Sequence, residues 1–339
     1  MINRNKTVKI GIVGCGYWGS NLIRNFLEIP NCEIAGLVDI DDEKIKNIKK
    51  SYPNLNIDKD IKILLANKEI EGIVIATPVS THYSLAREAL INRKHVLVEK
   101  PLAQTVRQAI DLIRLSESKN KIIMVDSTFI YSDAVQKLKK IIEKGDLGQI
   151  NYIDSTRANL GIFQKDINAL WDLAPHDFSI FNYILKEKPI AISAFGIDPL
   201  VYKKKLESII HVLITFEKGI VAHIFLSWLS PVKIRQMTFI GSKKMLVYDH
   251  LDLPNQIKIY NKSVKVFKYK KEMIQYYSGR VETPKIDQTE PLKLMCQHFI
   301  KCIKENKQPL TNAKSELKVV ELLEKAQESL RLKGKWIKI

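Results

Sequence analysis

A lysine stands where the chain leaves a predicted buried strand. Lys100 follows the apolar run 95–98 and Glu99, and Pro101 comes directly after it. Such a run predicts a buried strand, and open α/β sheets bind ligands at the carboxyl ends of their strands. An ammonium group at that edge is well placed for chemistry. The alternative is a lysine whose stem snorkels from a strand end into water.

Two further candidate groups lie four residues apart in the second half of the chain. Asp172 and His176 would share one face of a helix. Oxidising an alcohol by hydride transfer needs a base for the hydroxyl proton, and histidine titrates in the right range. A nearby ammonium such as Lys100 would hold the developing alkoxide. The alternatives are a helix N-cap for Asp172, with Pro175 in the first turn, and a core histidine for His176.

A glycine motif near the N-terminus favours binding of a dinucleotide. Gly14, Gly16 and Gly19 form a Gly-x-Gly-x-x-Gly pattern between a predicted strand and a predicted helix. These glycines would let a pyrophosphate approach the helix N-terminus. Asp39 ends the next strand, about 20 residues further on, where a carboxylate bonds the adenosine ribose and repels a 2′-phosphate. We therefore expect NAD rather than NADP. A plain turn and a helix cap are the alternatives.

The end of the third predicted strand is a secondary candidate. Thr77 and Pro78 follow that strand and could shape the nicotinamide side of a cofactor site, with His82 on the next helical turn. The alternative is a proline turn in which Ser80 caps the helix 80–92.

The elements that must position these groups change in kind along the chain. The first part alternates strands and helices, which predicts a parallel, doubly wound sheet. Its predicted strands are 8–13, 33–39, 72–76, 95–98 and 121–125, and its helices are 17–28, 41–50, 80–92 and 106–118. The later part has consecutive strands, which predict one open mixed or antiparallel sheet in an α+β domain. Its predicted strands are 149–156, 190–196, 208–216, 220–228, 234–241 and 245–248, and its helices are 132–144, 173–185, 291–304 and 315–330.

We therefore expect two domains, a Rossmann domain over residues 1–126 and a substrate and oligomerisation domain over 127–339. Whether the C-terminal helices pack back on the first domain stays open. Residues 268–288 are polar and rich in turn formers, which makes them a candidate mobile loop.

Composition limits the function classes. Of 339 residues, 45% are hydrophobic and 27% are charged, as in ordinary globular proteins. No apolar run approaches the roughly 18 residues of a membrane helix, and no secretory signal is present, so we expect a cytoplasmic location and no membrane partner. The four cysteines lack metal-binding spacing, so we expect free thiols and no metal. The net charge of +17 comes mostly from dispersed lysines, which favours anionic small molecules over nucleic acid.

Taken together, these motifs resemble the glucose-fructose oxidoreductase, inositol dehydrogenase and MocA family of oxidoreductases over essentially the whole chain. The segments that carry the resemblance are Gly14-Cys15-Gly16-Tyr17-Trp18-Gly19, Ala76-Thr77-Pro78, Glu99-Lys100-Pro101 and Asp172-x-x-x-His176. The resemblance implies a Rossmann domain, an α+β domain whose open sheet forms a homo-oligomer, and a cis Lys100–Pro101 bond. It implies that Lys100, Asp172 and His176 are catalytic. The cofactor residues that it implies are Gly14, Gly16, Tyr17, Trp18, Gly19, Asp39, Thr77, Pro78, His82, Glu99 and Lys100.

The segments 157–164 and 168–177 resemble family members that act on nucleotide-linked sugars. This implies oxidation of the C3 hydroxyl of UDP-N-acetylglucosamine to a ketone that feeds amino-sugar synthesis, with a substrate site that includes Arg157, Asn159, Trp171 and His176. Many polyol-oxidising members have a glycine-rich lead into the Asp-x-x-x-His segment, which is absent here. Arg157 could meet a phosphate or hydroxyl of the ligand, or form a surface salt bridge.

Several alternatives stay open. The substrate could instead be UDP-N-acetylglucosaminuronic acid, which would need an extra cation in the pocket, or a free polyol such as inositol. The enzyme could reduce a ketosugar in deoxysugar synthesis. A non-enzymatic sensor that binds a dinucleotide is the remaining alternative, although it would have no need of Lys100, Asp172 and His176 together.

Overall fold

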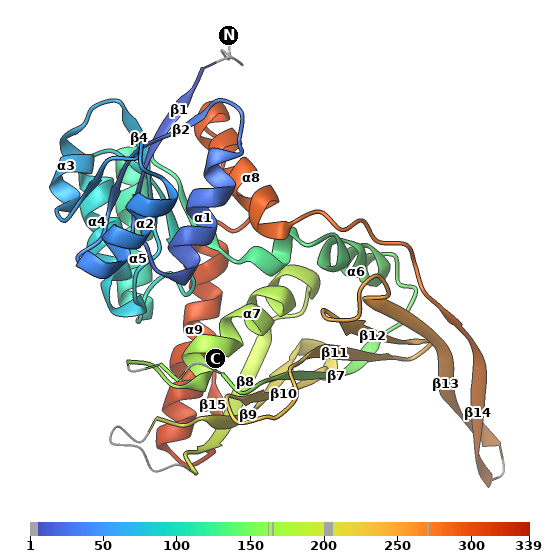
Figure 1. The fold of residues 1–339 in the computed structure, drawn as a ribbon. Helices are drawn as coiled ribbons and strands as arrows, with labels where there is room; N and C mark the ends of the chain where they lie inside the picture. The colour runs from blue at the N-terminus through green and yellow to red at the C-terminus, as the bar shows by residue number, and fades with distance from the viewer. Residues whose placement is uncertain (1–5, 162, 165, 200–205, 270) are drawn as a thin grey trace. The chain divides into compact units, whose positions relative to one another are not determined.

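The computed structural model describes residues 6–161, 163–164, 166–199, 206–269 and 271–339 (Figure 1). The chain folds into two compact units. The first comprises Met1–Tyr131 and Thr289–Val320, and the second comprises Ser132–Gln288 and Glu321–Ile339.

The first unit is built on a six-stranded parallel sheet with the order β3-β2-β1-β4-β5-β6. The strands are β1 (Val8–Val13), β2 (Cys32–Val38), β3 (Ile57–Asp58), β4 (Ile70–Ile75), β5 (His95–Glu99) and β6 (Ile123–Asp126). The helices are α1 (Tyr17–Leu27), α2 (Asp42–Ser51), α3 (Ile61–Ala66), α4 (Val79–Ile91), α5 (Val106–Lys119), the 3-10 helix η1 (Thr128–Tyr131), α8 (Pro291–Glu305) and the start of α9 (Ala313–Arg331). The strand order reverses between β1 and β4, which is where doubly wound folds bind ligands. The predicted Rossmann fold is confirmed.

Helix α8 and the start of α9 complete this unit from the far end of the chain. Arg24 of α1 and Glu290 form an ion pair at 2.5 Å, and the rings of Phe26 and Phe299 meet edge to face. The Val125 N–H donates to the Thr311 carbonyl at 2.9 Å. The C-terminal segment therefore contributes to the core of the first unit.

Two details of the first unit differ from the sequence-based expectations. The short strand β3 and helix α3 were not predicted, because they are too brief to show a periodic pattern. Helix α4 begins at Val79, directly after Pro78, so Ser80 lies inside the helix and does not cap it. The turn at this end is closed instead by Thr81, whose N–H donates to the Pro78 carbonyl at 2.9 Å.

The second unit is built on a nine-stranded mixed sheet with the order β14-β13-β12-β11-β7-β10-β9-β8-β15. The strands are β7 (Ile150–Ala158), β8 (Pro189–Ile197), β9 (Ile209–Phe216), β10 (Val221–Ser227), β11 (Ile234–Gly241), β12 (Met245–Asp249), β13 (Ile257–Tyr269), β14 (Lys271–Glu282) and β15 (Ile337–Lys338). The helical elements are α6 (Asp133–Glu143), α7 (Ala169–Ile184), the short 3-10 helix η2 (Glu217–Gly219) and the end of α9. Strands β7 and β10 pair in parallel and the other pairs are antiparallel, which confirms the predicted open mixed sheet.

Helices cover one face of this sheet. Along β10, Ala222, Ile224 and Leu226 are fully buried, whereas the alternate residues His223 and Phe225 are half-buried. Helix α7 packs on the buried face, beside β9 and β10 (Figure 1). The period of two is the reason that one face forms a core and the other stays more accessible.

Helix α7 begins earlier than expected. Asn168 caps it, with its side-chain oxygen accepting the Trp171 N–H at 3.3 Å. Asp172 is therefore inside the helix and is not its N-cap, and Pro175 lies in the helix interior, not in the first turn. The expectation was wrong because two candidate caps stand four residues apart, and the proline rule favoured the later one.

The candidate mobile loop is also corrected. Residues 271–282 form β14, which pairs along β13 in a long two-stranded hairpin (Figure 1). Residues 274–278 of this hairpin are exposed. A strand with little burial lacks the apolar alternation that identifies most strands, so its polar sequence resembled a loop.

Candidate functional site

The glycine loop of the first unit brings backbone segments into close contact at two glycines and leaves open space at a third. Gly14 has a φ of +96°, and a Cβ there would lie 2.3 Å from the Ala76 carbonyl oxygen. A Cβ on Gly19 would lie 2.0 Å from the Gly14 carbonyl oxygen. Nothing lies within 4 Å of the corresponding position on Gly16, which precedes α1 and gives it no side-chain cap. Uncapped N–H groups at a helix start suit a pyrophosphate, so the loop fits a dinucleotide.

Asp39 follows β2 at the same edge of the sheet. One carboxylate oxygen accepts the Cys15 N–H at 2.6 Å, and the other accepts the Asp41 N–H at 2.9 Å. Each oxygen has further lone pairs for ribose hydroxyls. Burial, together with Asp39, raises the pKa of the Cys15 thiol to about 12, so this cysteine stays a neutral thiol.

Two aromatic residues open α1. The side chains of Tyr17 and Trp18 are exposed, and their rings meet edge to face with centroids 5.2 Å apart. Their part in cofactor binding stays a prediction.

His82 joins two loops at the carboxyl edge of the first sheet. Its ring is fully buried. Nδ1 lies 2.8 Å from the Pro101 carbonyl oxygen, and Nε2 lies 2.9 Å from the Thr77 carbonyl oxygen. A ring held in this way supports the backbone after β4 and β5. We therefore expect His82 to act on a cofactor site by holding these two loops.

Glu99 ends β5 and Lys100 follows it, and the Lys100–Pro101 bond is cis. Glu99 stands opposite Asp126 in the pairing of β5 with β6, and both carboxyl groups are buried. Burial raises the pKa of Glu99 well above its usual value, and Asp126 adds to the rise because two carboxylates repel each other. The Thr128 hydroxyl donates to Asp126. We did not predict Asp126, although its position directly after a predicted strand was a usable signal.

The second unit places the remaining catalytic candidates on α7. Asp172 and His176 are half-buried and one helical turn apart, so they share a face. One carboxylate oxygen of Asp172 accepts the indole N–H of Trp228 at 3.0 Å. Trp228 follows β10, and neither it nor its role was predicted. This bond fixes the direction of the carboxylate beside His176.

Arg157 lies in the interior of this unit. Its Nε donates to Asp177 at 2.7 Å, and Asp177 also accepts the Ser155 hydroxyl at 2.6 Å. Arg157 and Asp177 are almost completely buried, so the alternative of a surface salt bridge is wrong and the ion pair is internal. Burial explains why the ion pair persists, because an unpaired charge there would be costly. A direct contact of Arg157 with substrate stays a prediction.

The other two predicted substrate residues have different neighbours. The Trp171 indole N–H donates to Gln327 at 3.0 Å. The Asn159 side-chain oxygen accepts a hydrogen bond from Arg235, the arginine of β11. Arg235 was also not among the predicted site residues.

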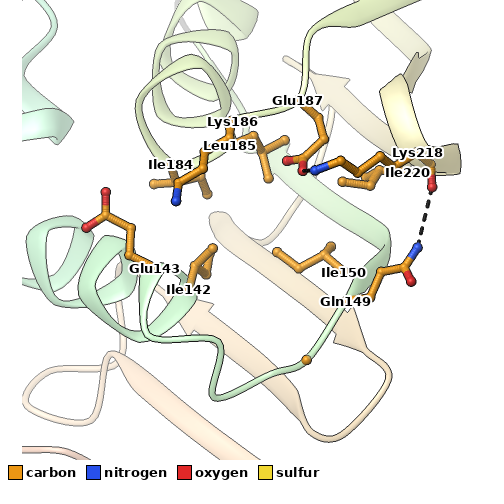
Figure 2. Close-up of a pocket in the computed structure, with 11 residues that line it drawn as sticks. Ile142, Glu143, Gln149, Ile150, Ile184, Leu185, Lys186, Glu187, Lys218 and Ile220 are labelled. Atoms are coloured by element: carbon orange, nitrogen blue, oxygen red, sulfur yellow. Dashed lines mark hydrogen bonds and ion pairs between the residues drawn. The ribbon is translucent and has the colours of Figure 1, made fainter.

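A surface pocket of about 330 Å³ lies elsewhere in the second unit (Figure 2). It is lined by Ile142 and Ile184, near the ends of α6 and α7, and by Ile150 at the start of β7, with the Glu187–Lys218 ion pair at its rim. Arg157 stands at the other end of β7, so this pocket is separate from the catalytic candidates. Across the described ranges, no group of three or more metal-ligating side chains comes together. No helix in the part of the chain that the structure describes has the length and apolar character needed to cross a bilayer.

Comparisons with known proteins agree with this organisation. Residues 8–127 match the family model described as "Oxidoreductase family, NAD-binding Rossmann fold", and residues 135–247 match the "GFO/IDH/MocA C-terminal domain". An uncharacterised oxidoreductase of Bacillus subtilis, YrbE, is 25% identical over 225 residues, which are 64% of this chain and 66% of that protein. The matches span about half to two thirds of the length of the first curated relatives.

Solved structures share the fold over nearly the whole chain. An NAD-binding protein from Listeria innocua superimposes with a TM-score of 0.83 at 21% identity, covering 98% of this chain and 97% of that one. UDP-N-acetylglucosamine 3-dehydrogenase from Acidithiobacillus ferrooxidans has a TM-score of 0.78 at 18% identity, covering 96% and 98%. Likeness at these identities concerns the fold.

Proposed function

We propose a dehydrogenase function for this chain, which belongs to the glucose-fructose oxidoreductase, inositol dehydrogenase and MocA family of oxidoreductases. The reaction is the NAD-dependent oxidation of the C3 hydroxyl of a nucleotide-linked hexose, UDP-N-acetylglucosamine, to the 3-keto sugar. The observation that carries this proposal is the pair Asp172 and His176, set on one face of α7 with the carboxylate fixed by Trp228, in a chain whose first unit has an NAD-binding fold.

Each candidate residue has a separate role in this proposal. NAD, when bound, accepts the hydride from the sugar carbon. His176 takes the proton of the C3 hydroxyl, and Asp172 orients the imidazole. The Lys100 ammonium stabilises the oxyanion that develops on the sugar. Asp39 selects NAD because its carboxylate would repel a 2′-phosphate.

The choice of substrate rests on the segment before Asp172 and on one structural relative. The residues 168–171 are Asn-Ala-Leu-Trp, without the glycine-rich lead of many polyol-oxidising members. The Acidithiobacillus ferrooxidans protein of the same fold is a UDP-N-acetylglucosamine 3-dehydrogenase. The uronic acid, a ketosugar and a free polyol are the other substrates that the assay below distinguishes.

The test is the formation of NADH by the full-length protein with a panel of UDP-sugars, UDP-N-acetylglucosaminuronic acid and myo-inositol. A trap for ketones is included, because the oxidation is expected to be energetically uphill. We expect turnover with UDP-N-acetylglucosamine and NAD. Equal turnover with NADP would refute the role of Asp39. Turnover only in the reverse direction, with a 3-keto sugar and NADH, would identify a reductase.

Variants test the assigned roles. Lys100→Ala and His176→Ala should each lower turnover by about 10²- to 10⁴-fold, because each removes a group that acts in the transition state. Lys62→Ala, an exposed lysine on α3, is the matched control and should keep normal turnover. Circular dichroism checks that the variants fold. Near-normal rates in both site variants would show that the catalytic assignment is wrong.

A further inference from the structure

Two arginines stand side by side in the second unit. Arg235 of β11 pairs directly with Arg157 of β7 in the antiparallel register. Cross-strand neighbours lie about 5 Å apart at Cβ, so their like charges repel unless acidic groups compensate. Asp177 compensates Arg157 through the 2.7 Å ion pair. The charge of Arg235 is handled differently.

Arg235 bonds only to neutral oxygens in the part of the chain that the structure describes. Its guanidinium donates to the carbonyl oxygens of Ala158 at 3.1 Å and Ile234 at 2.9 Å, and to the side-chain oxygen of Asn159. The carboxylates of Asp177 and Asp172 attract it through space, without a hydrogen bond. These neutral contacts fix where the guanidinium lies but leave its charge without a direct counter-ion.

Burial and a positive neighbour act together on the charge of Arg235. Burial and the charge of Arg157 lower the pKa of Arg235 to about 10, so it is still cationic near neutral pH. Burial and the charges of Arg157, Lys233 and Arg235 also lower the pKa of His250 to about 4, against the opposing charge of Asp249. His250 is therefore a neutral imidazole at pH 7. A half-buried cation without a contacting anion is unfavourable in the free protein and favours an anionic ligand.

The place of Arg235 connects it with the catalytic candidates of its own unit. Asn159, which accepts from Arg235, stands two residues before Gly161, and the Gly161 N–H donates to the Trp228 carbonyl at 3.0 Å. Trp228 in turn bonds Asp172 through its indole. A short chain of contacts therefore links Arg235 to the carboxylate beside His176.

We propose that Arg235 binds an anionic group of the substrate, either a phosphate of its nucleotide or a carboxylate on its sugar. This inference deepens the proposed function and rests on it for the view that the ligand is a sugar derivative. A guanidinium recognises both groups through paired N–H donors. The neutral contacts to Ala158 and Asn159 hold the guanidinium in place before the ligand arrives, which lowers the entropy cost of binding.

The test measures ligand binding, so it does not depend on turnover. Isothermal titration of the NAD-loaded protein would use UDP-N-acetylglucosaminuronic acid, UDP-N-acetylglucosamine, N-acetylglucosamine and myo-inositol. Arg235→Gln should weaken an anionic ligand by about 10- to 100-fold and leave the uncharged sugars unaffected. Weaker binding of both nucleotide sugars identifies a phosphate as the partner, and weaker binding of the uronic acid alone identifies its carboxylate. Arg280→Gln, an exposed arginine on β14, should change none of these constants.

Arg235→Lys keeps the charge but loses the paired donors, so it should bind the anionic ligands with intermediate affinity. This intermediate affinity would show that the loss in Arg235→Gln is not caused by misfolding. Unchanged affinity for both anionic ligands in Arg235→Gln would overturn the inference. So would a wild-type protein that binds neither anionic ligand, even if it oxidises inositol, in which case a dehydrogenase function would survive. Arg235-dependent binding without NADH formation would support the inference while contradicting the proposed reaction.

Discussion

Glu316 shows how burial at a single residue couples folding to pH. It lies in the first turn of α9 and is almost completely buried, with a hydrogen bond to Ser127. Burial raises its pKa from 4.5 to about 7. Between these two values the folded protein keeps a proton that the unfolded chain releases. The free energy of unfolding therefore falls as the pH rises through this window.

Replacing Glu316 should remove this pH dependence. One pKa unit corresponds to about 1.4 kcal/mol. As the pH rises from 4.5 to 8, the free energy of unfolding of Glu316→Gln should therefore gain up to about 3 kcal/mol relative to that of the wild type. Urea denaturation at the two pH values measures the difference. Glu328→Gln, an exposed position on the same helix, should show the same pH dependence of the free energy of unfolding as the wild type. The same pH dependence in Glu316→Gln would contradict the prediction.

At the residue scale, the sequence indicates the glycine loop but not the neighbours that the sheets create. The glycines could be identified because their spacing reflects the backbone itself, and Gly14 has a positive φ beside Ala76. Asp126 and Arg235 were missed because nothing in a single sequence states which strands become neighbours. The pairings of Glu99 with Asp126 and of Arg157 with Arg235 exist only once the sheets have formed.

At the scale of elements, the residues at the end of a helix fix its bounds as much as its hydrophobic periodicity does. Asn168 begins α7 through its bond to the Trp171 N–H, and its amide also donates to Glu207 at 2.8 Å and to Gln327 at 3.1 Å. The start of the helix that holds His176 is therefore tied both to its own first turn and to two other side chains.

Removing this cap should weaken the second unit. Asn168→Ala loses the cap and its side-chain partners, so we expect a loss of about 1 to 2 kcal/mol in the free energy of unfolding. Asn168→Ser keeps an acceptor for the Trp171 N–H without placing a charge beside Glu207, so it should lose less. Equilibrium denaturation in urea measures both. Equal stability of Asn168→Ala and the wild type would show that α7 does not depend on this residue.

Long elements with a buried face were predictable, whereas short elements and strands with little burial were not. Strand β10 alternates between buried and half-buried residues along its length, and this period identified it. The hairpin of β13 and β14 has exposed residues such as Tyr276 and Tyr277 and gave no such signal. Helix α8 was predicted as a helix, but an amphipathic face does not reveal which unit it will pack against.

At the scale of the whole molecule, the accessible face of the nine-stranded sheet is the candidate for assembly. Phe195 of β8 and Leu213 of β9 are exposed on adjoining strands. Near them, His223 bonds Asp154 at 2.7 Å and His211 at 3.1 Å. A face that combines large apolar side chains with a polar network resembles the interfaces of homo-oligomers. We propose that two or four copies assemble through it.

A charge placed on this face should break such an assembly. Leu213→Lys would put an unpaired ammonium into each copy of the interface, so sedimentation velocity should show a shift from dimer or tetramer to monomer. Ile63→Lys, at an exposed apolar position on α3 of the other unit, is the control and should leave the mass unchanged. A wild-type protein that sediments as a monomer would contradict the proposal.

The indole of Trp228 is a fluorescent group buried in the second unit. Its ring is 1% exposed and lies 5.4 Å from the ring of Phe163, and its N–H is bonded to the carboxylate of Asp172. The emission of an indole follows the polarity and the electric field around it. A molecule that approaches Asp172 should therefore alter the fluorescence of an indole that the chain already contains, so substrate arrival can be followed in real time without any label.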